Sequence, residues 1–403
     1  MLDLKKIGRA RKRIADVVLH TPLAYAPILS ELSGYEIYLK KENLQRTGSF
    51  KLRGAFNKIA VLNEEGRHNG VVAASAGNHA QGVAFAARHF GIDATIVMPE
   101  STPLTKVMGV RELGAEVILN GANYDESYAY AVKYAQEHGR DFVHPFADEE
   151  VVAGQGTIML EMLEEQPDLD AVVIPVGGGG LISGCAVAAK ALSPEMEVIG
   201  IASAGAPAMK LSYDAKKPID TTSVRTIADG IAVRDTSPVT LEYILRYVDQ
   251  MNLVGEDEIA SAILFLLERQ KLTVEGAGAV GVAAVLHKHL DLPAGSRVGI
   301  LLSGGNIDVT MLSLIIEKGL VKSYRKMKLV VTLIDKPGAL ECFAGLMREV
   351  QANIVQIGYD RTSTDLEFGD AHVSVALETK GEDHQEKVRQ ALREHGFPFR
   401  EEH

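Results

Sequence analysis

Apolar and polar positions follow a repeating order through the middle of the chain, from about residue 70 to residue 305. Each short apolar run is followed by a turn that contains glycine and then by an amphipathic segment with helical spacing. Several runs are continuously apolar, as strands are when helices cover both faces of a sheet. The pattern therefore predicts layered α/β structure with mostly parallel strands.

The expected strands of this region are 71–74, 94–98, 116–119, 171–176, 198–202 and 298–302. The expected helices are 78–89, 104–113, 125–137, 154–165, 182–192, 256–269 and 278–289. In the first 18 residues, charged residues alternate with apolar ones at helical spacing, which predicts one more amphipathic helix.

The pattern changes after residue 317. A polar, basic segment, 324–328, precedes an expected strand at 329–334, a helix at 338–350, strands at 354–359 and 371–377, a helix at 384–394 and a last strand at 397–400. This βαββαβ order predicts a small, separate C-terminal domain over residues 327–403. We expect the edges of its short sheet to need a partner.

Composition narrows the function classes. The 403 residues include 53 acidic and 42 basic side chains, a net charge of −11 that disfavours nucleic-acid binding. No apolar stretch approaches the length of a membrane span, and no signal peptide is recognisable. The two cysteines, Cys185 and Cys342, show no zinc-binding spacing and argue against a disulfide framework. A cytoplasmic protein with no membrane contact is expected.

Four consecutive glycines follow the apolar run AVVIPV and precede an apolar helix. Without side chains, the backbone N–H groups of Gly177 to Gly180 can converge at the helix N-terminus and bind a phosphate. A tight turn between strand and helix is the alternative. The run lacks the Gly-Lys-Ser/Thr ending of a P-loop.

Two further loops follow expected strands. Ser75-Ala76-Gly77-Asn78-His79 could hold the carboxylate of a small ligand, although a helix cap explains Asn78 equally well. Ser303-Gly304-Gly305-Asn306 could place the Ser303 hydroxyl against a ring nitrogen, or form another capped turn.

Glycines and lysines elsewhere are less informative. Gly276, Gly278 and Gly281 match the spacing of a dinucleotide-binding motif, but no clear buried strand precedes them, so close helix packing is the better interpretation. Lys51 could form a Schiff base with a carbonyl cofactor if its surroundings lower its pKa, whereas most lysines stay solvated.

Taken together, four segments make a specific resemblance. SFKLRGA around Lys51, SAGNHAQG from Ser75, GGGGLISG from Gly177 and SGGN from Ser303 occur in this order. They resemble the pyridoxal-phosphate enzymes of fold type II, and most closely the threonine dehydratases (threonine ammonia-lyases). The resemblance covers roughly residues 1–320. It implies a catalytic domain over residues 1–322 built from two open α/β subdomains, the smaller at about 50–145.

The resemblance implies roles for individual residues. Lys51 is expected to form the Schiff base with pyridoxal 5'-phosphate, Phe50 to pack against its ring, Asn78 to bond its phenolic oxygen and Ser303 to meet its pyridine nitrogen. The phosphate is expected on Gly177, Gly178, Gly179, Gly180 and Leu181. The substrate carboxylate is expected on Ser75, Ala76, Gly77, Asn78 and His79. Glu275 and Asp229-Gly230 resemble residues on the far side of the ring.

The activity implied is loss of water from L-threonine, and also L-serine, giving 2-oxobutanoate or pyruvate and ammonia. Lys51 is expected to remove the Cα proton while the cofactor accepts the electron pair. The cofactor phosphate is the expected proton donor to the departing hydroxyl.

Other activities stay open. Serine racemases of this fold place a serine where this chain has Ala76, which has no proton to give, so elimination is favoured over racemisation. Other β-elimination or β-replacement reactions, and a non-catalytic amino-acid sensor, are the remaining alternatives. No metal site is expected, because residues 202–206 lack an acidic side chain and Asp229 stands alone.

The C-terminal segment DKPGAL, residues 335–340, resembles the corresponding loop of ACT regulatory domains. This likeness implies allosteric regulation by an amino-acid effector, as in isoleucine biosynthesis, with assembly as a homodimer or homotetramer. A plain helix cap in a domain that serves only oligomerisation is the alternative.

Overall fold

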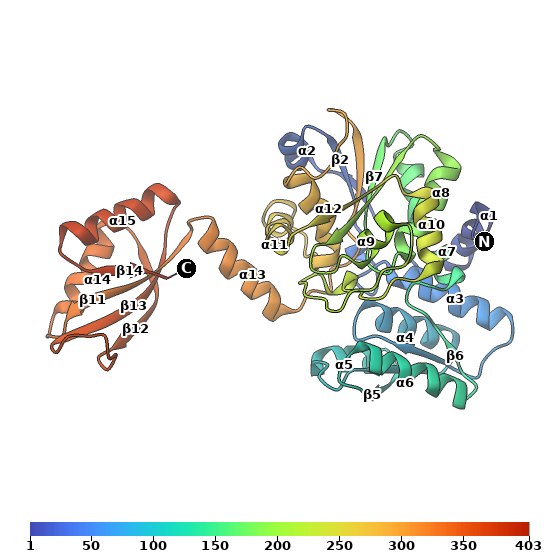
Figure 1. The fold of residues 1–403 in the computed structure, drawn as a ribbon, viewed down its shortest axis with the longest axis horizontal. Coiled ribbons are helices and arrows are strands. Elements are labelled where there is room, and N and C mark those ends of the chain that lie inside the picture. Colours follow the sequence, from blue (N-terminus) through green and yellow to red (C-terminus); the bar gives the residue numbers. More distant parts are fainter. Residues whose placement is uncertain (403) are drawn as a thin grey trace. The chain divides into compact units, whose positions relative to one another are not determined.

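The computed structural model describes residues 1–402, which form two compact units. The first runs from Met1 to Ile307 and the second begins at Asp308 (Figure 1). Helix α13 (Val309–Lys322) falls in the second unit, whereas the family resemblance implied a catalytic domain that ends at residue 322. The functional domain boundaries stay a prediction.

The first unit contains two sheets, as expected for two α/β subdomains. The larger has the strand order β1 (Leu23–Tyr25), β2 (Glu36–Lys40), β10 (Arg297–Leu301), β7 (Ala171–Pro175), β8 (Glu197–Ser203) and β9 (Gln250–Val254). Only β1 runs antiparallel to its neighbour. The smaller has the order β5 (Glu116–Leu119), β4 (Ala94–Met98), β3 (Val71–Ala74) and β6 (Asp141–Phe142), all parallel. The predicted mostly parallel architecture is confirmed.

The helices of the first unit surround these sheets. They are α1 (Leu4–Ile14), α2 (Pro27–Ser33), α3 (Lys51–Glu64), α4 (Asn78–Phe90), α5 (Leu104–Glu112), α6 (Tyr124–Glu137), α7 (Glu149–Glu165), α8 (Gly180–Leu192), α9 (Ala208–Ala215), α10 (Pro238–Tyr247), α11 (Glu256–Phe265) and α12 (Gly276–Leu286). Short helical turns lie at η1 (Glu42–Leu44), η2 (Asp229–Ile231) and the π-turn η3 (Leu266–Gln270).

The continuously apolar strand β3 is covered on both faces, because successive side chains pack into two different cores. Val71 and Ala73 pack into the core shared with α3 and α4, whereas Val72 and Ala74 pack against Ala131 of α6. Successive side chains of a strand point to opposite faces, so both faces of the small sheet are buried.

A buried ion-pair network joins the cores of the two subdomains. Arg53 of α3 is fully buried, and its guanidinium contacts Glu42 at 2.7 Å and Glu161 of α7 at 2.6 Å. Lys40, also fully buried, lies 2.8 Å from Glu161. Because α3 packs in the small-sheet core and α7 contributes to the large-sheet core, these contacts tie the subdomains together.

The second unit forms the predicted βαββαβ arrangement. Its antiparallel sheet has the order β12 (Asn353–Asp360), β13 (Asp370–Glu378), β11 (Lys326–Ile334) and β14 (Phe399–Glu401). Helices α14 (Ala339–Glu349) and α15 (Glu382–Glu394) pack on one face through residues such as Phe343 and Val388. The basic segment 324–328 was predicted to precede the first strand, but its last three residues, from Lys326, form the start of β11.

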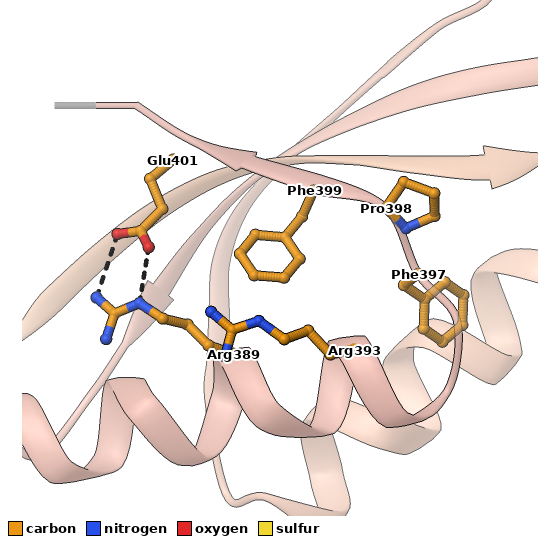
Figure 2. A pocket seen from close by; sticks show the side chains of 6 residues that line it. All are labelled: Arg389, Arg393, Phe397, Pro398, Phe399 and Glu401. Carbon is orange, nitrogen blue, oxygen red and sulfur yellow. Dashed lines mark hydrogen bonds and ion pairs between the residues drawn. The ribbon is translucent and has the colours of Figure 1, made fainter.

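A cavity of about 810 Å³ lies between α15 and β14 in this unit (Figure 2). Arg389 donates to Glu401 at 2.7 Å across it, and Arg393 lies 5.8 Å from the centre of the Phe399 ring. Both arginines also contact Glu386. The guanidinium groups of the cavity are therefore paired with carboxylates of the same unit.

Several elements differ from the prediction. The pattern did not indicate β1, β2, β6, β9, α2, α3, α9 or α10. Helix α7 begins at Glu149 rather than at residue 154, because Asp148 caps it by accepting hydrogen bonds from the N–H groups of Glu150 and Val151. The last turn of the helix predicted to reach residue 269 widens into a π-turn after Phe265.

Within residues 1–402, no helix is long and apolar enough to cross a membrane.

Candidate active site

The residues singled out from the sequence lie on loops at the carboxyl ends of parallel strands. In open α/β sheets ligands bind at this edge. The loops are 41–50 after β2, 75–77 after β3, 143–148 after β6, 176–179 after β7 and 302–306 after β10.

Lys51 is the first residue of α3, and its side chain is half-buried. Its Nζ donates a hydrogen bond to the carbonyl of Pro145 at 3.0 Å and lies 5.4 Å from the centre of the Phe50 ring. Burial lowers the pKa of Lys51 from its ordinary 10.5 to about 8, although the Glu275 carboxylate acts in the opposite direction. A substantial fraction of this amine is therefore neutral near pH 8.

The glycine loop leads into the N-terminus of α8, a 13-residue helix. The backbone N–H groups of Gly177 to Leu181 donate to no acceptor within residues 1–402. Free donors at a helix N-terminus attract an anion through hydrogen bonds and the helix dipole. The loop therefore has the donor set that a phosphate requires.

Packing also requires glycine in this loop. A Cβ atom on Gly178 would lie 2.4 Å from the Phe146 ring, and one on Gly180 would lie 2.8 Å from the Phe146 carbonyl oxygen. Gly179 adopts φ = 84°, which favours glycine. The alternative interpretation, a tight turn, therefore describes the loop correctly but leaves its free N–H groups unexplained.

The segment after β6 links Lys51 to the glycine loop. Pro145 accepts the Lys51 hydrogen bond, and the next residue, Phe146, contacts Gly178 and Gly180. The Lys51 amine and the glycine loop therefore contact two consecutive residues, Pro145 and Phe146, of the same segment.

The Ser75 to His79 segment comprises the loop after β3 and the first two residues of α4. The Ser75 hydroxyl accepts a hydrogen bond from the N–H of Gly77 at 3.1 Å, while the N–H groups of Ala76, Asn78 and His79 have no acceptor within residues 1–402. These free donors at the N-terminus of a 13-residue helix suit a carboxylate.

Asn78 connects the two sides of the site. Its amide donates to Glu275 at 2.7 Å, and its carbonyl oxygen accepts from Asn306 at 2.7 Å. One of its two amide hydrogens stays available for a ligand oxygen. Burial raises the pKa of Glu275, which is 8% exposed.

Ser303 lies near the start of the 302–306 loop. It is 2% exposed, and its carbonyl accepts from the N–H of Phe50 at 3.0 Å. Ser49 pairs with Gly304, so the loop that carries Lys51 is attached directly to the Ser303 loop. No acceptor or donor for the Ser303 hydroxyl occurs within residues 1–402, which leaves it available to a ring nitrogen.

Sequence reasoning missed three contributors to the site. His144 and Phe146 lie in the segment after β6, and Thr240 donates to the carbonyl of Gly178 at 2.8 Å. β6 has only two residues, too few for a recognisable strand pattern. The His-Pro-Phe sequence after it was the available signal.

The remaining motifs are accounted for by packing. A Cβ atom on Gly278 would lie 2.7 Å from Val274 and one on Gly281 2.7 Å from Ile300, so the predicted role of Gly276, Gly278 and Gly281 in close helix packing is confirmed.

Asp229 lies 3.6 Å from Lys106 of α5. Residues 1–402 contain no group of three or more His, Cys, Asp or Glu side chains arranged to hold a metal ion.

The arrangement suits one kind of ligand. A half-buried amine with a lowered pKa can condense with an aldehyde, and the free N–H groups of the glycine loop can bind a phosphate on the same molecule. Asn78 and Ser303 add donors for oxygen and nitrogen atoms of an intervening ring. The donor set therefore fits pyridoxal phosphate.

Comparison with known proteins points the same way. Residues 14–304 match the family model described as "Pyridoxal-phosphate dependent enzyme". The L-threonine ammonia-lyase of Thermotoga maritima is 51% identical over 400 residues, covering 99% of each chain. The solved structure of a threonine deaminase from the organism abbreviated T.th. is 39% identical, with a TM-score of 0.72, and covers 76% of this chain and 99% of that one. Maize serine racemase is 35% identical, with a TM-score of 0.74, covering 80% and 99%.

Proposed function

The chain belongs to the family of pyridoxal-phosphate-dependent enzymes, and from this we propose how its side chains serve the cofactor and the substrate. The enzyme is a threonine ammonia-lyase, which removes water from L-threonine and yields 2-oxobutanoate and ammonia. The observation that carries the residue assignments is the shared loop: the Lys51 amine and the glycine loop contact its consecutive residues Pro145 and Phe146.

Each group at the site has a proposed task. Lys51 holds the cofactor and then moves a proton at the substrate Cα, a task that suits an amine whose pKa lies near the working pH. The five N–H groups of Gly177 to Leu181 bind the phosphate, and Phe50 packs against the ring. When bound, pyridoxal phosphate supplies the electron sink for the pair left on Cα.

The substrate is oriented by the start of α4. The N–H groups of Ala76, Asn78 and His79 bind the α-carboxylate, which fixes the Cα–H bond relative to Lys51. Asn78 bonds the phenolic oxygen of the ring with its free amide hydrogen. The Ser303 hydroxyl meets the pyridine nitrogen without holding it firmly protonated as a carboxylate would, which favours rapid loss of the β-hydroxyl.

L-Serine as a second substrate, a cytoplasmic location, an amino-acid effector and assembly as a homodimer or homotetramer also belong to the proposal. The effector is assigned to the loop 335–340, where Gly338 adopts φ = 89° and no side chain caps the N-terminus of α14. The βαββαβ order of the second unit supports a regulatory role for it.

A substrate screen tests the activity. The purified enzyme is incubated with L-threonine, L-serine and hydroxylated analogues, with and without isoleucine and valine, and the release of keto acid and ammonia is measured. Chiral analysis of the remaining serine tests the racemase alternative: D-serine forming faster than pyruvate would overturn elimination as the main reaction. Amino-acid binding without ammonia release would favour the sensor.

Gly178→Ala is expected to weaken cofactor binding. The added methyl group would lie 2.4 Å from Phe146, so the loop must shift and its N–H groups must leave their positions. Losing one charge-assisted hydrogen bond raises the Kd for pyridoxal phosphate on the order of 10- to 100-fold. An absorbance titration of the apoenzyme measures this change.

Gly8→Ala is the matched control for that substitution. Gly8 lies in α1 with no atom within 4 Å of an added Cβ, so the variant should bind the cofactor as the wild type does. Equal cofactor affinity of Gly178→Ala and Gly8→Ala would contradict the phosphate assignment.

Cofactor uptake is expected to depend on pH through Lys51. Only the neutral amine is nucleophilic, and its folded-state pKa of about 8 lies below the ordinary 10.5, so uptake should rise with pH and reach half its maximum near pH 8. Stopped-flow absorbance of the apoenzyme mixed with pyridoxal phosphate across the range from neutral to alkaline pH measures the profile. A rate that still climbs steeply beyond about pH 9 would show an amine with the ordinary pKa of a free lysine.

A further inference from the structure

We propose that His144, locked with its proton on Nε2, donates a hydrogen bond to an anionic oxygen bound in the active site, either of the cofactor phosphate or of the substrate carboxylate. The identities of these two ligands rest on the proposed function. The sequence motifs did not include His144, and the mechanism above does not use it.

Hydrogen bonds within its own loop fix the tautomer of His144. Its Nδ1 accepts from the backbone N–H of Ala147 at 2.8 Å and of Phe146 at 3.2 Å. A ring nitrogen that accepts hydrogen bonds carries a lone pair, so the proton of the neutral imidazole must lie on Nε2. Protonating Nδ1 would break both bonds.

The surroundings of His144 keep the ring neutral. Burial and the charge of Lys51 on α3 lower its pKa to about 4, while Asp148 at the start of α7 acts in the opposite direction. His79 also interacts electrostatically with His144, and the rings of Tyr128 from α6 and Phe146 lie 5.9 and 4.7 Å away. The ring therefore stays a neutral donor throughout the pH range in which Lys51 titrates.

The position of His144 places this donor in the site. The residue after it, Pro145, holds Lys51, and Phe146 lies against Gly178. The ring is half-buried, and its Nε2 has no acceptor within residues 1–402.

His79 provides an internal comparison. Its Nε2 donates to the carbonyl of Val143 at 2.8 Å, and its Nδ1 is buried without a partner. The only ring N–H group of neutral His79 is therefore already used. Of the two histidines beside Lys51, His144 alone has a ring N–H left for a ligand.

Two substitutions separate the two ring nitrogens. His144→Asn keeps an acceptor near the position of Nδ1 and removes the donor at Nε2, whereas His144→Gln keeps an N–H group near the position of Nε2 and removes the local acceptor. We expect the asparagine variant to lose on the order of 10- to 100-fold in affinity for one ligand, and the glutamine variant to lose less.

Two measurements identify the acceptor. Absorbance titration of the apoenzyme gives the Kd for pyridoxal phosphate, and steady-state assays of the saturated holoenzyme give KM for L-threonine. A raised Kd with unchanged KM in His144→Asn assigns the phosphate, and a raised KM with unchanged Kd assigns the carboxylate. Wild-type values of both in His144→Asn would overturn the proposal.

The tautomer is tested without any turnover. Nitrogen NMR of the histidine-labelled wild-type holoenzyme, assigned by comparison with His144→Gln, should show Nε2 protonated and Nδ1 bare around neutral pH. A protonated Nδ1 would overturn the proposal even if the variants fold poorly. Because this measurement and the cofactor titration need no threonine turnover, failure of the proposed function is distinguishable from failure of this inference.

Discussion

Lys51→Ala should lose at least about 10³-fold in kcat for L-threonine, because the substitution removes both the group that holds the cofactor and the group that moves the Cα proton. The visible absorbance of the lysine-bound cofactor should disappear with it. Production of 2-oxobutanoate and the absorbance spectrum of the purified variant measure the two losses. Retained turnover would show that another amine carries the chemistry.

Lys133→Ala is the control for that experiment. Lys133 lies on α6, and its side chain is 72% exposed. Removing it should leave the spectrum and the rate unchanged. Unfolding curves of both variants separate the loss of a catalytic amine from a loss of structure.

Arg53→Met should destabilise the first unit by about 3–5 kcal/mol, because it leaves the buried carboxylate of Glu42 without its cation and that of Glu161 with Lys40 alone. Methionine fills much of the same volume, so the effect measures charge rather than a cavity. Urea unfolding, followed by the change in midpoint at constant slope, gives the free energy. A loss below about 1 kcal/mol would mean that the network contributes little to stability.

The charge explanation has two controls. Arg11→Met removes a cation that pairs with Glu164 on the surface, where both side chains are more than two-fifths exposed, and should cost at most about 1 kcal/mol. Adding Glu42→Gln to Arg53→Met should recover part of the loss, since the carboxylate left without a cation is then gone, while Glu161 stays paired with Lys40.

Strands with simple patterns were predictable from the sequence. Every residue of β3 and β4 is buried, and the apolar runs gave the bounds that β3, β4 and β5 have in the structure. In contrast, β2 contains Lys40, which is fully buried by pairing with Glu161, and a lysine in a buried strand hides the apolar pattern.

The predicted start of α7, at residue 154, was too late, and the glycines near it have a packing role. Gly154 and Gly156 both lie inside the helix. A Cβ atom on Gly154 would lie 2.5 Å from the Arg53 carbonyl, and one on Gly156 would lie 2.8 Å from that of Gly184. Close packing of α3 and α8 against α7 therefore requires them, and such long-range contacts leave no local signal.

Site residues that belong to the motifs of a known family could be predicted from the sequence. The residues of the loop after β6, which contacts both Lys51 and the glycine loop, could not. Lys51, Asn78, the glycine loop and Ser303 came from motifs. The loop residues Pro145 and Phe146 contact Lys51 and Gly178, which lie far away along the chain, and only folding brings these residues together.

The most direct test of the central claim locates the cofactor on the chain. The holoenzyme is reduced with borohydride, which makes the bond between lysine and cofactor permanent, and its peptides are mapped by mass spectrometry. We expect a phosphopyridoxyl group on Lys51 alone. Finding that group on another lysine, or on none, would contradict the assignment of Lys51 as the residue that holds the cofactor.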